Sequence, residues 1–230
     1  MIRIVLVEPQ EAGNVGAAAR VMKNFGHRDL WIAGEHPNLH PLAGWWASGA
    51  DDVVQSAHFV PTLAEALADA HVTIATTSMR GRTTPVDLTP RDVAAIASIL
   101  ASDQTLALVF GRENSGLTRD EVVMCQQTCS VPTDKEFPTM NLAQTVGIFC
   151  YELSSIVPSS TPRELAPAGL VERLHRRAEE LLLEVGFLHA NNPDRIYDDV
   201  RAMAGRADLD AREVKILLGM IRQIEWKVKK

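Results

Sequence analysis

Five stretches of the chain are almost continuously apolar, and segments with apolar residues at helical spacing lie between them. The apolar stretches cover residues 3–8, 29–34, 72–78, 105–111 and 128–133. The helical patterns between them cover residues 14–25, 48–56, 61–70, 89–101 and 118–127. Parallel strands that helices cover on both faces have this nearly unbroken hydrophobicity. The alternation therefore predicts an α/β fold with a parallel sheet.

The pattern changes after the last predicted strand, where only helical periodicity remains. A long helix is predicted over residues 141–157. Residues 158–169, "PSSTPRELAPAG", hold three prolines and several small or polar residues, which is typical of a linker. Helical patterns then continue from residue 170 to the end of the chain. We therefore predict an α/β domain over 1–157, a linker over 158–169 and a small all-α domain over 170–230.

Composition adds the class of protein and its compartment. Hydrophobic residues make up 46% of the chain and charged residues 23%, as in globular proteins, and no apolar run approaches the roughly 20 residues of a membrane helix. The N-terminal residues lack the pattern of a secretory signal. Cys125, Cys129 and Cys150 form neither a disulfide framework nor a metal-binding pattern. We expect a cytoplasmic protein with reduced thiols, no metal and no membrane contact.

The net charge of −6 argues mildly against a nucleic-acid binder, but it hides an asymmetry. Residues 1–157 hold 10 basic and 17 acidic side chains, a balance of −7, whereas residues 158–230 hold 13 and 12, a balance of +1. In the acidic part, arginines lie selectively in the predicted turns; they are Arg20, Arg80, Arg82, Arg112 and Arg119. A local basic site on an acidic protein therefore remains possible.

Three stretches combine glycine or proline with polar residues next to predicted strands. They read "GNVGAAAR" (13–20), "VFGRENSGLT" (109–118) and "SVPTDKEFPTMNLAQTVG" (130–147). Open α/β sheets bind ligands at the carboxyl ends of their strands. Each stretch taken alone is equally well explained as an ordinary turn, and Gly13 and Gly16 lack the spacing of a dinucleotide-binding loop. The three together, in this order, indicate a functional site.

Together these stretches resemble motifs 1, 2 and 3 of the SpoU branch of the SPOUT RNA methyltransferases. The similarity covers essentially the whole chain. Further stretches, "GADDVV", "TLAEALADA", "TTSMR" and the tail from "VGFLHANN" onward, are similar to the TrmJ group. Members of that group methylate the ribose 2′-hydroxyl of nucleotide 32, a cytidine or uridine, in the tRNA anticodon loop. The resemblance implies a cytoplasmic enzyme of tRNA processing.

The resemblance also implies a fold and a cofactor. The fold would be a homodimer of α/β domains, each with a deep trefoil knot in its C-terminal part, although protein chains generally avoid knots. The cofactor would be S-adenosylmethionine, held in the loops of the knot. Several contacts would use backbone groups, for which glycine permits close approach. The implied cofactor-binding residues are Thr77, Ser78, Met79, Gly111, Val131, Pro138, Thr139 and Met140.

The resemblance makes Arg20 the first candidate for a catalytic residue, in a site shared with the partner subunit. A guanidinium can bind an RNA phosphate through two hydrogen bonds and so hold the ribose in line with the methyl group. A role as the proton acceptor is harder to support, because the pKa of arginine lies above roughly 12. Asn14 would orient the ribose or Arg20, and Asn141 would fix the third motif or the ribose.

Other candidates keep two interpretations open. Glu113 could pair with an arginine of the site or form a purely structural salt bridge. Arg80, Arg82 and Arg112 could contact RNA phosphates or be ordinary surface charges. Thr139 stands where the SpoU pattern usually has serine. Its hydroxyl preserves a possible catalytic hydrogen bond, and its added methyl group stiffens the side chain.

Three alternatives to this hypothesis follow from the same residues. The enzyme could methylate another tRNA position or ribosomal RNA, although the tail favours the anticodon-loop group. The chain could be a catalytically silent RNA-binding dimer, for which Thr139 is the only supporting feature. A dinucleotide-dependent oxidoreductase is the third, and the glycine spacing argues against it.

Overall fold

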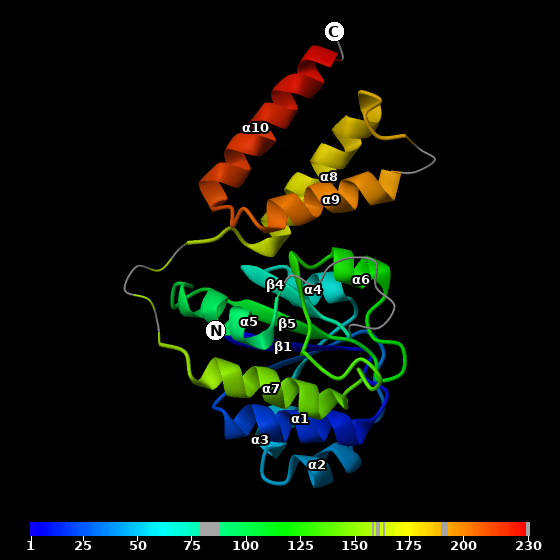
Figure 1. Ribbon diagram of the computed structural model, residues 1–230, viewed down its shortest axis with the longest axis vertical. Coiled ribbons are helices and arrows are strands. Elements are labelled where there is room, and N and C mark those ends of the chain that lie inside the picture. The colour runs from blue at the N-terminus through cyan, green and yellow to red at the C-terminus, as the bar shows by residue number, and fades with distance from the viewer. Residues whose placement is uncertain (79–87, 158, 160–161, 163, 190–192, 229–230) are drawn as a thin grey trace.

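The computed structural model describes residues 1–78, 88–157, 159, 162, 164–189 and 193–228. In this part of the chain, a parallel sheet with helices on both faces is followed by three further helices (Figure 1). The strands are β1 (Ile2–Val7), β2 (Asp29–Ala33), β3 (His58–Val60), β4 (Val72–Thr76), β5 (Leu106–Phe110) and β6 (Gln127–Cys129). The helices are α1 (Ala12–Asn24), α2 (Leu42–Ala47), α3 (Asp51–Gln55), α4 (Leu63–Leu67), α5 (Pro90–Ser98), α6 (Arg119–Val123), α7 (Leu142–Ser154), α8 (Ala168–Glu184), α9 (Pro193–Gly205) and α10 (Ala211–Val228).

The six strands pair in the order β3-β2-β1-β5-β4-β6, and every pairing is parallel. The chain builds one half of the sheet outward from β1 and then crosses to build the other half. This reversal beside β1 is the place where open α/β sheets form a crevice at the carboxyl ends of their strands. The predicted α/β fold with a parallel sheet is confirmed, and the trefoil knot stays a prediction.

Both faces of the sheet are buried, which explains the unbroken hydrophobicity of its strands. On β1, Ile4 and Leu6 belong to one core with α1, α3, α5 and α7, whereas Val5 and Val7 belong to a second core with α4. All four side chains are almost fully buried. Because side chains alternate across a strand, a strand that packs on both faces needs apolar residues at every position.

Two elements differ from the expectation. The sequence pattern did not predict strand β3. Its residues His58 and Phe59 are exposed at the edge of the sheet, so they form no apolar run. Helix α2 was not predicted either, because its Gly44 and two tryptophans hide the helical pattern. It packs on α1, where the side-chain-free Gly16 lies against the carbonyl of Ala43: a Cβ at position 16 would come 2.0 Å from that oxygen.

Helix α8 begins at Ala168, two residues before the predicted start, and the residues just before it are packed. Leu165 and Ala166 are buried, and the N–H of Ala166 donates to the carbonyl of Leu209. Helices α8 and α10 share a small core that includes Val171, Leu174 and Val214. None of the described helices has the length and hydropathy of a membrane-spanning segment.

Helix α9 packs against the segment that leads into β6. The backbone of Gly205 lies so close to Gln126 that a Cβ at position 205 would be 2.3 Å from its carbonyl oxygen. The side-chain amide of Gln127 donates to the carbonyl of Gly205, and Nε of Arg201 donates to the carbonyl of Val123. An ion pair between Arg119 and Asp198 lies beside these contacts. The last part of the chain therefore covers the connection between β5 and β6.

Candidate active site

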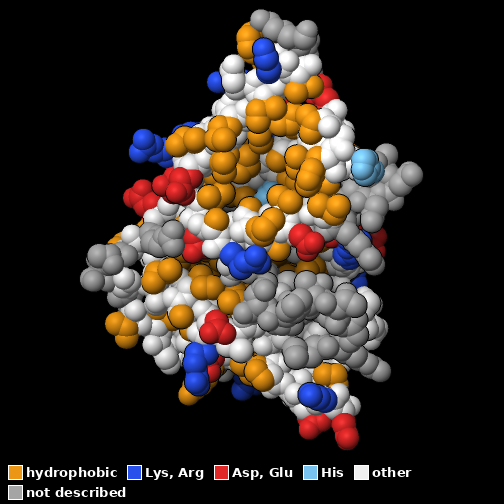
Figure 2. Space-filling view, turned by 45° about the horizontal axis from the view of Figure 1, so that its top comes forward, with side chains coloured by type: hydrophobic (Ala, Val, Ile, Leu, Met, Phe, Trp, Pro, Cys, Tyr) orange, Lys and Arg blue, Asp and Glu red, His pale blue; other side chains and the backbone are white. Residues whose placement is uncertain are grey.

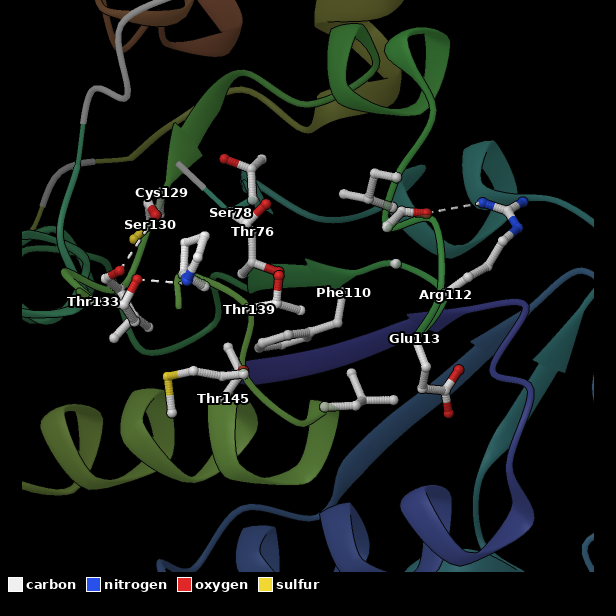
Figure 3. Close-up of a pocket in the computed structure, with 18 of the residues that line it drawn as sticks. Thr76, Ser78, Phe110, Arg112, Glu113, Cys129, Ser130, Thr133, Thr139 and Thr145 are labelled. Carbon is white, nitrogen blue, oxygen red and sulfur yellow. Dashed lines mark hydrogen bonds between the residues drawn. The ribbon is translucent and has the colours of Figure 1, made fainter. Parts of the chain in front are cut away.

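A cavity of about 420 Å³ opens at the carboxyl ends of β4, β5 and β6 (Figure 3). Its walls come from the ends of these strands, from the loops 111–117 and 130–140, and from one face of α7. A volume of this size suits a small-molecule ligand. The sheet topology alone predicts a ligand at this edge, because the strand order reverses beside β1.

The structure brings the predicted cofactor-binding residues to this one cavity. The described members of the set all line it; they are Thr77, Ser78, Gly111, Val131, Pro138, Thr139 and Met140. Met79 lies outside the described residues, as do Arg80 and Arg82. The loop after Val131 is held by a hydrogen bond from the Thr133 hydroxyl to the carbonyl of Pro138. Residues from three separate parts of the sequence therefore share one pocket.

The glycines of the second motif make its tight loop possible. Gly116 has a φ of +70°, and its N–H donates to the carbonyl of Arg112 at 2.8 Å. A Cβ at Gly111 would lie 2.2 Å from the carbonyl carbon of Gly116. The loop can fold back on itself only because position 111 has no side chain. Its backbone thereby lines the cavity.

One residue that lines the cavity has a buried polar atom without a partner among the described residues. Oγ1 of Thr77 is buried and has no hydrogen-bond partner among the described residues, whereas the backbone N–H of Thr77 donates to the carbonyl of Cys129. A buried hydroxyl without a partner costs free energy, which a ligand that bonds to it would recover. On another wall, Phe110 and Phe149 pack edge to face. Hydroxyls and backbone groups beside an aromatic pair suit a nucleoside-like ligand.

A chain of hydrogen bonds connects the three motifs beside the cavity. The Glu113 carboxylate accepts from Nδ2 of Asn14 at 2.9 Å and from the backbone N–H of Gln10 and Glu11 at the start of α1. Oδ1 of Asn14 accepts from Nδ2 of Asn141 at 3.0 Å. Oδ1 of Asn141 accepts from the backbone N–H of Ala143 and Gln144, and so caps α7. We call Glu113, Asn14 and Asn141 the amide chain.

All partners of Glu113 in the amide chain are uncharged N–H groups. The two interpretations above, an ion pair with an arginine of the site and a purely structural salt bridge, both find no support among the described residues, where Glu113 forms no ion pair. A carboxylate at the start of α1 is favourable, because the first N–H groups of a helix lack partners within it and carry a partial positive charge. The Glu113 carboxylate therefore fixes the second motif to the start of the first.

Arg112 points away from Glu113 and forms a separate cluster with Glu8 and Glu121 (Figure 3). We call these three residues the arginine clamp. Two hydrogen bonds join the guanidinium to the Glu121 carboxylate at 2.9 and 3.0 Å, and Nε donates to Glu8 at 2.8 Å. The acceptor Glu121 raises the pKa of Arg112, and Glu8 adds to this shift. Burial by itself would raise the pKa of Glu121, but its hydrogen bonds from Arg112 and Thr118 hold that pKa below the ordinary value.

The clamp also explains two backbone features. Glu8 has a φ of +43°, which is uncommon for a residue with a side chain. A Cβ at Gly34 would lie 2.7 Å from Cγ of Glu8, so the glycine leaves room for the side chain that reaches Arg112. Because both carboxylates occupy the mostly buried guanidinium, the structure argues against the suggested contact of Arg112 with an RNA phosphate.

Arg20 lies apart from the cavity and from the amide chain. It is exposed on α1 and forms no hydrogen bond or ion pair with any residue that the structure describes. It lies four residues after Gly16, on the face of α1 that packs on α2. Its guanidinium is therefore available to another molecule.

Some residues of the cavity were not singled out from the sequence. Leu142, Thr145 and Phe149 of α7 face it. They are three and four positions apart in succession, which places them on one helix face, so the helical period contained this signal. No local pattern in the sequence indicated that Glu8 binds Arg112, because the two residues are 104 positions apart.

Metal and thiol chemistry receive no support from the described residues. No group of three or more His, Cys, Asp or Glu side chains gathers there at metal-binding distances. Cys129 lines the cavity, but its thiol is buried, and burial raises its pKa to about 12. Burial raises the pKa of Cys150 to about 12 as well. Both thiols therefore stay protonated and unreactive at neutral pH.

Family models match both parts of the chain. Residues 1–151 match the SpoU rRNA Methylase family, and residues 170–230 match the C-terminal domain of the tRNA methyltransferase TrmJ. The resemblance of the three motifs and of the tail is thereby confirmed.

Known proteins match nearly the whole chain. The tRNA (cytidine/uridine-2′-O-)-methyltransferase TrmJ of Cronobacter sakazakii is 37% identical over 97% of this chain and 96% of its own length. The crystal structure of TrmJ from Z. mobilis has a TM-score of 0.85 at 33% identity, covering 98% of this chain and 99% of that one. The SpoU methyltransferase AviRb from Streptomyces viridochromogenes, solved with AdoMet, has a TM-score of 0.53 at 21% identity over 67% of this chain and 59% of its own, and so shares the fold alone.

Proposed function

The chain belongs to the SpoU methylase family, and on this premise we propose that it methylates the ribose 2′-hydroxyl of nucleotide 32, a cytidine or uridine, in the anticodon loop of tRNA. Family membership makes it an RNA 2′-O-methyltransferase with S-adenosylmethionine as cofactor. The relatives named tRNA (cytidine/uridine-2′-O-)-methyltransferase, which match over nearly the full length, support a tRNA substrate. The similarity of the tail to the anticodon-loop group supports nucleotide 32.

The cavity at the ends of β4, β5 and β6 fits the cofactor. The unpartnered Thr77 hydroxyl, the backbone around Gly111 and the loop from Pro138 to Met140 would hold it. S-adenosylmethionine, when bound, supplies a methyl group that its sulfonium already activates. The reaction therefore asks the protein mainly to bring the 2′-hydroxyl into line with that methyl group.

The amide chain is the observation that carries this proposal. It joins residues from all three motifs next to the cavity. Asn14 and Asn141 would orient the ribose, and Glu113 would fix Asn14 through the hydrogen bond to its Nδ2. Thr139, at the edge of the same cavity, would offer its hydroxyl to the substrate or the cofactor.

Arg20 would bind an RNA phosphate and so orient the target nucleotide. It is exposed, always charged, and without a partner among the described residues. Because it lies outside the cavity of its own chain, we propose that the enzyme is a homodimer in which Arg20 serves the cavity of the partner subunit. This arrangement would explain why one copy holds the cofactor pocket and the amide chain but lacks a free cation among the described lining residues.

The test is methyl transfer to an unmodified tRNA transcript, with mass spectrometry of the digested nucleosides to locate the product. We expect a 2′-O-methyl group at nucleotide 32 and a rate at least about 100-fold lower in Arg20→Ala, with unchanged affinity for S-adenosylmethionine. Arg28→Ala is the matched control, because it removes an exposed arginine just after α1 whose one ion-pair partner among the described residues is the surface residue Asp52.

The outcomes separate the parts of the proposal. Methylation at another nucleotide would overturn position 32 and keep the reaction. Cofactor binding without methylation of tRNA or ribosomal RNA would favour a silent RNA-binding protein. Equal rates for Arg20→Ala and Arg28→Ala would remove Arg20 from the site.

A further inference from the structure

Large hydrophobic side chains are exposed in two different settings on this molecule. Figure 2 shows many of them together over the upper part of the molecule, where α8–α10 lie. Phe137 belongs to none of these helices and lies in the loop 130–140, which forms one wall of the cavity. It is 80% exposed, more than any other phenylalanine, tyrosine or tryptophan side chain that the structure describes. Single exposed hydrophobic residues are common on proteins, so the place of Phe137 beside the cavity is the informative part.

The ring of Phe137 has no partner among the described residues of its own chain. It belongs to none of the hydrophobic cores and pairs with no other aromatic ring there. The three residues just before it are charged and exposed; they are Asp134, Lys135 and Glu136. Charged residues are depleted from the buried centre of protein–protein interfaces, so these surroundings do not favour a second protein as the partner of the ring.

The backbone of the loop holds the ring in a defined place. The hydroxyl of Thr133 donates to the carbonyl of Pro138 at 3.2 Å and closes the loop. Within it, the N–H of Glu136 donates to the carboxylate of Asp134 at 2.7 Å. Pro138 also restricts the residue before it, Phe137, to extended backbone. A ligand that meets the ring therefore finds a loop that is already ordered, which lowers the free-energy cost of binding.

Phe137 lies close to the place proposed for the ribose. Thr139, which would offer its hydroxyl there, follows Phe137 by two residues, and two residues span at most about 7 Å. Pro138, Thr139 and Met140 all line the cavity. In a nucleotide, the base is attached to the ribose carbon next to the one that carries the 2′-hydroxyl. A ring beside the ribose is therefore within reach of the base of the same nucleotide.

We propose that Phe137 stacks on the base of the target nucleotide and so holds its ribose in the cavity. This inference rests on the proposed function, because it needs that nucleotide in place. Proteins bind unpaired RNA bases by stacking them on aromatic side chains. Stacking accepts any base, because every base has an aromatic face. It therefore suits a target that is either a cytidine or a uridine.

The test combines removal of the ring with removal of the base. One substrate is the unmodified tRNA transcript, and the other is the same tRNA with an abasic ribose at nucleotide 32. On the first substrate, we expect Phe137→Ala to lower kcat/KM at least about fivefold and Phe137→Tyr to keep it within about twofold. Phe59→Ala is the matched control and should leave kcat/KM unchanged, because it removes an exposed phenylalanine of β3, at the opposite edge of the sheet from β6.

On the abasic substrate, the unsubstituted chain should be at least about fivefold slower than on the first. Phe137→Ala should slow this reaction no further, because the ring has lost the base on which it stacks. Equal slowing by Phe137→Ala on both substrates would overturn the proposal. A lower affinity of Phe137→Ala for S-adenosylmethionine, or a changed mass of the protein in solution, would also overturn it, because the ring would then serve the cofactor or a contact between copies. No product at nucleotide 32 from the unsubstituted chain would instead overturn the proposed function, and the stacking with it.

Discussion

Arg112 and Glu113 are neighbours in the sequence, yet they belong to two polar clusters of opposite character. The arginine clamp is closed: Arg112 lies between two carboxylates, and the side chains of Arg112 and Glu121 are only 16% and 14% exposed. The amide chain is open: its charged member binds uncharged N–H groups, and Asn141 at its other end is exposed. The closed cluster has no capacity left for a ligand, whereas the open one has.

The two clusters give one loop two different roles: the arginine clamp supports the structure, and the amide chain serves the reaction. The clamp ties the loop at Gly111–Gly116 to the end of β1 through Glu8 and to the start of α6 through Glu121. The amide chain ties the same loop to α1 and α7, next to the cavity. We therefore expect changes in the clamp to act mainly on stability and changes in the amide chain to act mainly on methyl transfer.

Arg112→Met should have the largest effect, and it should be on stability. It leaves the carboxylates of Glu8 and Glu121 without their cation, and the Glu121 side chain is mostly buried. Removing one member of a buried ion pair is costly, so we expect a loss of about 2–3 kcal/mol in the free energy of unfolding and a fall of about 4–12 °C in Tm. Calorimetry and urea unfolding measure both quantities. If Arg112→Met lowered the free energy of unfolding by less than Glu113→Gln does, the assignment of stability to the clamp would be wrong.

Glu113→Gln should show the reverse pattern. One amide oxygen remains to accept a hydrogen bond, so the free energy of unfolding should fall by less than about 1 kcal/mol. Asn14 and the start of α1 lose the carboxylate that holds them, so methyl transfer should fall at least about tenfold, equivalent to about 1.4 kcal/mol. Single-turnover kinetics at saturating cofactor measure the rate. An unchanged rate would assign Glu113 to structural support only.

Two substitutions at Asn141 should separate its two hydrogen-bonding roles. Asn141→Ala removes the cap of α7 and should cost about 1 kcal/mol of stability. Asn141→Asp keeps an oxygen that can cap the helix, but it cannot donate to Asn14. The aspartate variant should therefore keep its stability and still lose methyl transfer. Full activity in Asn141→Asp would show that the bond to Asn14 does not matter.

The smallest effect should appear in the pH dependence of stability. The folded-state pKa of Glu121 lies below its ordinary value of 4.5, so the unfolded state binds more protons as the pH falls. The stability that this pair contributes is present above pH 4.5 and is lost as the pH falls through the lowered folded-state pKa. Arg112→Met should make the free energy of unfolding depend less on pH in the acid range. Glu113→Gln should leave the contribution of Glu121 in place. Urea unfolding between pH 3 and 7 compares the two.

The sequence predicted most of the sheet because burial on both faces leaves a local signal. The runs around Ile4, Ile74 and Leu108 are apolar at successive positions, and all three residues are fully buried. His58 and Phe59 of β3 are exposed at an edge, so the same rule gave no strand there. The pocket residues Thr77, Gly111 and Pro138 were predicted from the resemblance of the motifs, and the cavity joins them.

Side-chain partners could not be predicted in the same way. Arg112 meets Glu8 across 104 positions and Asn141 meets Asn14 across 127, and no local spacing encodes such pairs. The sequence therefore left Arg112, like Arg80 and Arg82, open between an RNA contact and an ordinary surface charge, and only the fold showed its two carboxylate partners. Arg20 was also singled out from the sequence, and its catalytic role stays a prediction.

The contact of Gly205 with Gln126 has a consequence for the order in which the enzyme is completed during synthesis. The chain leaves the ribosome from its N-terminus, and Gln127 is made 78 residues before the glycine whose carbonyl receives its side-chain amide. At about 5–20 residues per second, the start of β6 is synthesised about 4–16 s before Gly205 of helix α9, which packs against it. The nascent chain thus holds all three motifs well before helix α9 can dock. The contact between α9 and the segment before β6 can therefore form only after all three motifs have been made.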